Sequence, residues 1–126
     1  VRSRIERGAT MSASAYIDLL NARQHWIVRM EAALAPFDAL LSPTVPLVAP
    51  PIADVAPGAE RDAEFFRINA LLLRNTSVVN MLDGCALSLP CHMAGELPVG
   101  LMVWHGALHD DAVLNVGLQI EQILQK

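Results

Sequence analysis

The sequence of 126 residues predicts an α/β fold with about three helices and about three strands. Long segments whose apolar residues recur every three or four positions alternate with short apolar runs of strand length. Apolar residues make up 53% of the chain and charged residues only 17%, which excludes a disordered chain. We expect residues 1–126 to form a single unit whose excess apolar surface faces more protein.

The first predicted helix covers residues 12–35. Ser12 or Ser14 is a suitable N-cap, and Pro36 ends the helix because the residue before a proline avoids the helical region. Apolar side chains recur along one side of this segment, at Tyr16, Leu20, Ile27, Met30 and Leu34.

A short strand and a proline-rich loop follow. The run 39–42 is apolar and bounded by Asp38 and Pro43, which favours a buried strand. Residues 43–58 form a loop, because its prolines cannot donate to a backbone hydrogen-bond ladder. The loop is too apolar for a solvated linker, so we expect it to pack on the rest of the chain.

A second helix follows the turn at Pro57-Gly58, with acidic residues at 60, 62 and 64 suited to its first turns. Residues 76–79 are poor helix formers, which predicts a kink or break near them. The apolar stripe of this helix comprises Phe65, Ile68, Leu72, Val79 and Leu82.

Two strand-length segments, 85–91 and 99–104, are separated by a short connection that contains Gly95, so we expect neighbouring antiparallel strands. Asp110 or Asp111 caps a last helix. The residues of this helix expected to face inward are Val113, Leu114, Gly117, Leu118 and Ile120.

Composition excludes several classes of function. Nine basic and thirteen acidic residues give a net charge of −4 with no basic block, which argues against nucleic-acid binding. No apolar run approaches the roughly 20 residues of a membrane span. Two cysteines make no disulfide framework, so a reducing, cytoplasmic setting is the default expectation.

Motifs for metals, cofactors and hydrolysis are weak. Cys85 and Cys91 are too far apart on one strand to share a zinc ion with His92, so we expect buried core cysteines and no metal site. His105 and His109 fit a turn or rim better than a metal pair. We find no phosphate-binding glycine motif and no Gly-x-Ser-x-Gly elbow, and we expect no cofactor.

Polar residues stand out late in the second helix, at Arg74, Asn75, Thr76 and Asn80. One interpretation is a helix end whose polar groups are satisfied by the backbone. The other is that these residues edge a ligand cleft. Both interpretations stay open from the residues alone.

The order of motifs resembles that of the amidase-signature hydrolases. Asp38-Ala-Leu-Leu-Ser-Pro-Thr44-Val-Pro46 with Ala49-Pro50 is similar to their D-x-L-L-x-P-T-x-P-x-x-A-P stretch. Four further segments are similar in the same order: Leu73-Arg-Asn-Thr76 with Asn80, Ala86-Leu-Ser-Leu-Pro90-Cys91, Leu97-Pro-Val-Gly-Leu101, and a closing helix with Asp110, Leu114 and Glu121. Departures from the family pattern occur at Asp83, Cys85, His92 and Met102.

The resemblance implies that this chain is the C-terminal part of a mixed sheet with flanking helices, in a hydrolase that cleaves amide bonds. It also implies a Ser–cis-Ser–Lys triad in the N-terminal half of such enzymes, where a lysine acts through one serine on the nucleophilic serine. The single lysine here is Lys126 and no Gly-Gly-Ser-Ser stretch exists, so no catalytic residue can be assigned in this chain.

We therefore expect the C-terminal portion of an amidase, inactive alone, which forms sheet and substrate-cleft wall. Its expected partners are the N-terminal half of the same amidase, a small-molecule amide substrate and, through exposed apolar faces, further copies of itself. The candidate substrate-binding residues are Thr44, Arg74, Asn75 and Thr76. Arg74 lies in an apolar stretch, which predicts a carboxylate partner or an anionic ligand. The alternative is a stand-alone α/β interaction module without catalysis.

Overall fold

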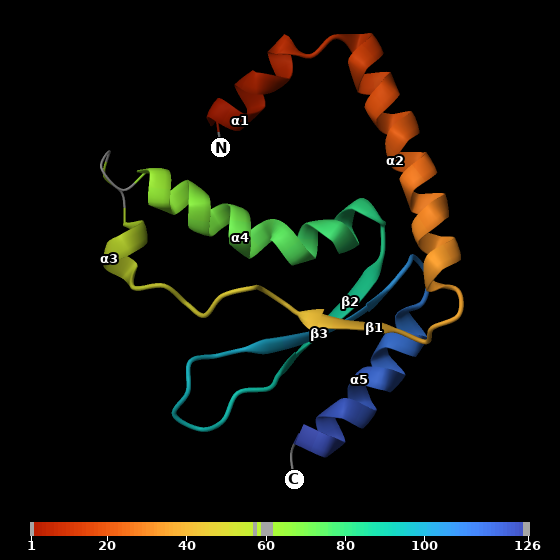
Figure 1. The fold of residues 1–126 in the computed structure, drawn as a ribbon, viewed down its shortest axis with the longest axis vertical. Coiled ribbons are helices and arrows are strands. Elements are labelled where there is room, and N and C mark those ends of the chain that lie inside the picture. Colours follow the sequence, from red (N-terminus) through yellow and green to blue (C-terminus); the bar gives the residue numbers. More distant parts are fainter. Residues whose placement is uncertain (1, 57, 59–61, 125–126) are drawn as a thin grey trace. The chain divides into compact units, whose positions relative to one another are not determined.

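The computed structural model describes residues 2–56, 58 and 62–124. Pro57, Glu60 and Lys126, which the sequence argument used, lie outside the described residues. The chain divides into two compact units, residues 1–33 and 34–126. Within these units it is a mixed α/β structure (Figure 1), whose elements in chain order are α1 (Arg2–Glu6), η1 (Arg7–Thr10), α2 (Ala13–Leu34), β1 (Leu40–Pro43), α3 (Ile52–Val55), α4 (Asp62–Met81), β2 (Cys85–Pro90), β3 (Gly100–His105) and α5 (Asp110–Leu124).

Helix α2 confirms the first predicted helix to within a residue at each end. Ser12 is the N-cap, since its Oγ accepts the backbone N–H of Ala15 at 3.1 Å. The expected apolar stripe is only partly buried. Ile27 and Leu34 are buried, whereas Tyr16 and Leu20 are exposed. The two short helical segments before α2 were not predicted from the sequence.

The sheet has the order β1-β3-β2 with both pairs antiparallel, so the pairing expected for the last two strands is confirmed. Leu41 and Leu87 both lie opposite Val103, which places β3 in the centre of the sheet. Strands β1 and β2, which are distant in the sequence, therefore lie on the two sides of the same strand.

Helix α5 covers one face of this sheet. Val113 forms a buried cluster with Leu89 and Val103, and Val116 and Ile120 pack against that cluster. Helix and sheet approach closely because residue 117 is glycine: an added Cβ would collide with the Leu87 side chain.

Two predictions about α5 are wrong in detail. Leu114 and Leu118 are 56% and 54% exposed, so they form a second apolar side of the helix that faces away from the sheet. The helix begins at Asp110, so the position before it belongs to His109, and both aspartates lie in the first turn.

Helix α4 runs from Asp62 to Met81, so the break predicted as one alternative near residues 76–79 does not occur, and the other alternative, a kink, stays a prediction. Burial of Val79 and of Leu82 just beyond the helix outweighs the weak helix propensity of this segment. Part of the predicted stripe is not buried, since Phe65 is 43% and Leu72 38% exposed.

Among residues 2–56, 58 and 62–124, no helix is long and apolar enough to cross a membrane.

A Schellman motif ends α4. Gly84 N–H donates to Val79 O at 3.0 Å and Asp83 N–H donates to Asn80 O at 3.3 Å. Asp83 has the left-handed conformation, with φ of 54°. This geometry favours glycine at position 83, and Asp can occupy it because Asp tolerates the left-handed region.

The loop from Pro43 contains one short helix, α3, and is otherwise mostly irregular. Val45 and Leu47 are half-buried, whereas Val48 and Ile52 are 47% and 85% exposed. The loop therefore buries some of its apolar side chains and leaves others in solvent.

Candidate functional site

The candidate site lies at the end of the sheet where β1 and β2 finish and β3 begins. Thr44 N–H donates to Gly100 O at 2.8 Å, which continues the ladder between β1 and β3. On the other side, Cys91 N–H donates to Val99 O at 3.0 Å. These bonds hold the residues that follow β1 and β2 on opposite sides of the start of β3.

A hydroxyl pair crosses this end of the sheet. Thr44 Oγ1 and Ser88 Oγ are 2.5 Å apart, although 44 positions separate the two residues in the sequence. Gly100 makes the pairing possible, because a Cβ there would lie 2.6 Å from Ser88 Oγ and 2.7 Å from Thr44 Oγ1. The glycine thus leaves room for two hydroxyls that any other residue would displace.

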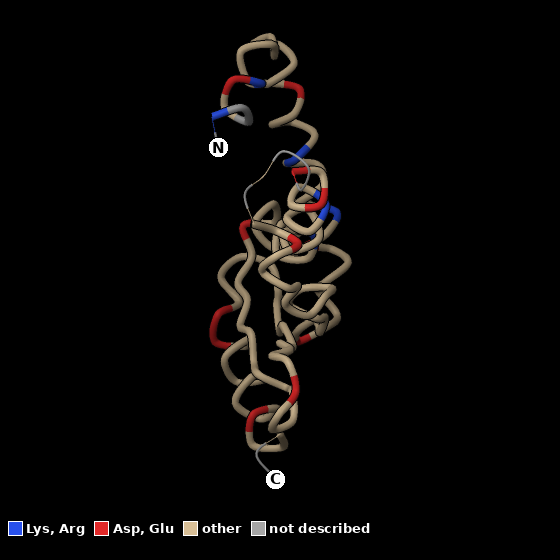
Figure 2. Tube along the Cα trace, turned by 90° about the vertical axis from the view of Figure 1, so that its left-hand side faces the viewer, with Lys and Arg blue, Asp and Glu red and all other residues tan. Residues whose placement is uncertain are grey.

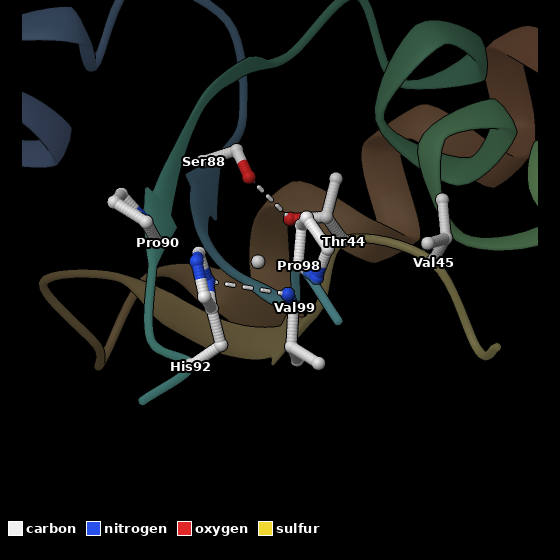
Figure 3. Close-up of a pocket in the computed structure, with 8 residues that line it drawn as sticks. Thr44, Val45, Ser88, Pro90, His92, Pro98 and Val99 are labelled. Atoms are coloured by element: carbon white, nitrogen blue, oxygen red, sulfur yellow. Dashed lines mark hydrogen bonds between the residues drawn. The ribbon is translucent and has the colours of Figure 1, made fainter. Parts of the chain in front are cut away.

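The pair borders an open hollow of about 350 Å³. Figure 3 shows the Thr44 and Ser88 hydroxyls pointing toward each other, and His92 with its ring nitrogen facing the Val99 amide. Val99 N–H donates to His92 Nδ1 at 3.4 Å, a long hydrogen bond. The lining is mostly apolar and consists of Thr44, Val45, Ser88, Pro90, His92, Pro98, Val99 and Gly100.

Helix α4 reaches the same end of the sheet through Asn75. Its Nδ2 donates to Pro43 O at 2.7 Å, one residue before Thr44. The structure thus brings two of the four candidate residues, Thr44 and Asn75, next to each other. Thr76 is turned away toward its own helix, where Oγ1 donates to Leu73 O at 3.4 Å.

Arg74 does not have the surroundings that the sequence argument assumed. The side chain is exposed, and its Nε donates to Asn75 Oδ1 at 3.3 Å. No ion pair of Arg74 with a described carboxylate is present. An exposed guanidinium remains hydrated and needs no buried partner, so the expected carboxylate is absent from the part of the chain described here.

Sequence reasoning missed three residues of this site. Ser88 and Gly100 were included only within motifs of the family resemblance, and His92 only as a possible metal ligand and as a departure from the family pattern. The contact between Ser88 and Thr44 depends on the register of β1 and β2 on the two sides of β3, which the sequence does not give. The close approach at Gly100 depends on side-chain positions and had no sequence signal.

The described residues contain no group of three or more potential metal ligands. Cys85 is half-buried and its Sγ donates to Gly106 O at 3.3 Å, whereas Cys91 is exposed, which corrects the expectation that both are core cysteines.

The lining of the hollow includes no glutamate or aspartate, and its polar side chains are two hydroxyls and one imidazole. Figure 2 shows where the acidic and basic residues lie along the chain.

His105 is a structural residue at the far end of β3. It is 4% exposed and stacks on His109, with ring centroids 3.8 Å apart, so it is buried and not at a rim as expected. Gly106 N–H donates to His105 Nδ1 at 2.8 Å. The ring proton is therefore on Nε2, which donates to Phe37 O at 3.1 Å.

Comparison with known proteins identifies the family. The family model described as Amidase matches residues 1–114, which include β1, β2, β3 and every residue of the site. No curated protein and no solved structure matches the chain. The motifs, the α/β fold and the length of this match agree, and the chain belongs to the amidase family.

Proposed function

We propose that this chain is the C-terminal portion of a hydrolase that cleaves carbon–nitrogen bonds of amides, and that it supplies sheet strands and one wall of the substrate cleft. The match to the family over residues 1–114 carries this proposal. The chain itself has one lysine and no Gly-Gly-Ser-Ser stretch. The serine nucleophile and its lysine base are therefore proposed to belong to a segment outside this sequence.

The proposed wall includes Thr44 and Asn75, whose neighbourhood is held together by the hydrogen bond from Asn75 to Pro43 O. Arg74 and Thr76 flank Asn75 on the same helix. Arg74 is exposed and carries a permanent positive charge, so it can attract an anionic part of a substrate. An uncharged substrate would contact only the amide and hydroxyl groups of this wall.

Exposed apolar side chains support a protein partner for this chain. On α4, Phe66, Leu73 and Met81 are 51%, 46% and 48% exposed, and α5 adds Leu114 and Leu118. Soluble monomers rarely expose large contiguous apolar patches. We propose that the N-terminal half of the same amidase covers part of this surface, and that copies of the chain associate when it is absent.

The test compares this chain with the full product of its gene. The gene upstream of Val1 is read for a lysine and a Gly/Ser-rich segment with serines, and both proteins are assayed on a simple aryl amide. We expect such an upstream segment, turnover by the full product and none by the chain alone. Turnover by the chain alone, abolished by changing one of its residues, would overturn the proposal.

Substitutions in the wall separate the amidase from the alternative. In the full product, Asn75→Leu should lower kcat/KM about fivefold, which corresponds to the loss of roughly one hydrogen bond. Asn80→Leu is the matched control, because Asn80 is an exposed asparagine of the same helix. A start codon close to residue 1, together with no amide turnover, would instead favour a stand-alone interaction module.

A further inference from the structure

We propose that the hollow bordered by Thr44, Ser88 and His92 binds an uncharged carbonyl group that carries a short apolar substituent, as in the primary amide of a small acyl group. The inference deepens the proposed function, on which the link to amide substrates rests. The residues that line the hollow in this structure all belong to this chain.

The hydrogen-bonding groups of the hollow are suited to a carbonyl oxygen. Between Thr44 and Ser88, one hydroxyl proton is used within the pair at 2.5 Å, which leaves the other hydroxyl proton available. Val99 N–H donates to Nδ1 of His92, so this nitrogen carries no proton and Nε2–H is a second donor. A carbonyl oxygen has two lone pairs and can accept from two donors.

The charge of the hollow favours a neutral ligand over an anion. None of its lining residues is Lys, Arg, Asp or Glu. A carboxylate that entered would lose part of its hydration without gaining a cationic partner, which is unfavourable. A carbonyl of an amide loses much less hydration for the same hydrogen bonds.

The size and walls of the hollow limit the substituent. A volume of about 350 Å³ is near the lower end of small-molecule sites. Val45, Pro90, Pro98 and Val99 provide apolar surface around the polar groups. This surface fits a substituent of a few carbons, and each methylene in contact should raise affinity about threefold to fourfold.

Gly100 keeps the site open in advance of binding. A side chain at this position would move one or both hydroxyls of the pair, because even a Cβ would lie within 2.7 Å of each. Ser88 is also held in β2, and on the other side of β3 the backbone N–H of Thr44 donates to Gly100 O. The donors are therefore positioned before a ligand arrives, which lowers the entropic cost of binding.

The experiment is a titration of the 126-residue chain with propionamide, followed by its ¹H–¹⁵N NMR spectrum, with propionate as the matched anion. We expect saturable shifts of the Val99 and Gly100 amides, roughly millimolar affinity for propionamide, and at least about fivefold weaker binding of propionate. Thr44→Val should weaken propionamide binding about fivefold, whereas Thr10→Val, which removes an exposed hydroxyl from η1, should leave it unchanged.

A second variant keeps the test decisive if Thr44→Val unfolds the chain. His92→Phe retains an aromatic ring at an exposed position and removes the Nε2–H donor, so it should weaken binding by a similar factor. Equal binding of the two ligands, no shift at Val99 and Gly100, or unchanged affinity in these variants would overturn the inference. Amide hydrolysis by the full gene product without such binding would contradict this site alone, whereas binding without hydrolysis would contradict only the proposed function.

Discussion

Replacing Gly84 with alanine should destabilise the chain more than any other glycine-to-alanine change considered below. Gly84 connects the Schellman motif of α4 to the first residue of β2. An added Cβ would collide with the carbonyl oxygen of His105 and would lie 3.3 Å from Val79 Cγ1. His105 is paired with Cys85 across the sheet, so its carbonyl cannot move without distorting the ladder between β2 and β3.

The magnitude follows from comparing three glycines. Overpacking costs about 1–3 kcal/mol, and we expect about 3 kcal/mol for Gly84→Ala because the obstacle is backbone. Gly95→Ala meets nothing within 4 Å but forces alanine to φ of 87°, which costs about 1–2 kcal/mol. In Gly117→Ala the only close obstacle is the end of the flexible Leu87 side chain, and the gain of about 1 kcal/mol in helix propensity offsets part of that strain.

Thermal unfolding followed by circular dichroism measures these differences. With about 4 °C per kcal/mol for a chain of this length, Gly84→Ala should lower Tm by about 12 °C and Gly95→Ala by about 4–8 °C. Gly117→Ala should remain within a few degrees of the unsubstituted protein. If Gly84→Ala has the same Tm as Gly95→Ala, the collision with the sheet does not exist and the reasoning is wrong.

Three further changes have defined outcomes. Asn75→Leu should lower the free energy of unfolding in urea by about 1–3 kcal/mol, because Pro43 O loses its donor. Leu118→Lys should shift the mass found by sedimentation equilibrium toward the monomer, because it puts a charge on the exposed apolar side of α5. A hydrogen bond from Arg67 lowers the pKa of Glu64 from its ordinary 4.5. The ion pair of Glu64 and Arg67 therefore stabilises α4 fully above pH 4.5, and this stabilisation is lost as the pH falls through the lowered pKa of Glu64. Glu64→Gln should therefore make the helicity measured by circular dichroism less sensitive to acid.

Matched controls and contrary results separate these effects from general damage. Asn80→Leu should leave the unfolding free energy nearly unchanged, and a loss equal to that of Asn75→Leu would contradict a specific role for Asn75. Gln119→Lys adds the same charge to α5 at an exposed polar position. If it dissociates the protein as strongly as Leu118→Lys does, net charge and not the apolar side controls association. If the helicity of the Glu64→Gln variant falls in acid as steeply as that of the unsubstituted protein, the pair of Glu64 and Arg67 is not the source of the acid sensitivity.

Secondary structure was largely predictable because its signals are local. Ser12 and Pro36 bounded the first helix, and the observed element is Ala13–Leu34. The strand predicted at 39–42 is Leu40–Pro43, and the last two strands pair as expected. Capping groups, prolines and apolar spacing act within a few residues, so each could be interpreted without knowing the fold.

Burial was less predictable because it depends on what lies against each side chain. Apolar residues occupy more than one side of α5, and spacing could not decide that Val113 faces the sheet while Leu114 and Leu118 face away. The break predicted near residues 76–79 is absent for a related reason. Helix propensity is a weak local preference, and burying Val79 provides more free energy than the helical conformation of this segment costs.

The candidate site was found only in part. Thr44 and Asn75 were selected from the sequence, and the structure places Asn75 on the carbonyl of the residue before Thr44. Arg74 is exposed, although its apolar neighbours in the sequence predicted a buried environment. Ser88 was not predicted as the partner of Thr44, because that contact depends on the register of two strands on either side of a third.

By itself, the sequence determined the long helices and the strands, their order and the resemblance to amidases, because these depend on local chemistry and on motifs that can be read along the chain. The tertiary structure alone decided which side of α5 is buried, that His105 is enclosed, and that Thr44, Ser88 and Gly100 meet. The physical reason is that burial and close contact are properties of pairs of surfaces. Residues 44 positions apart become neighbours only after the central strand has fixed the register on both of its sides.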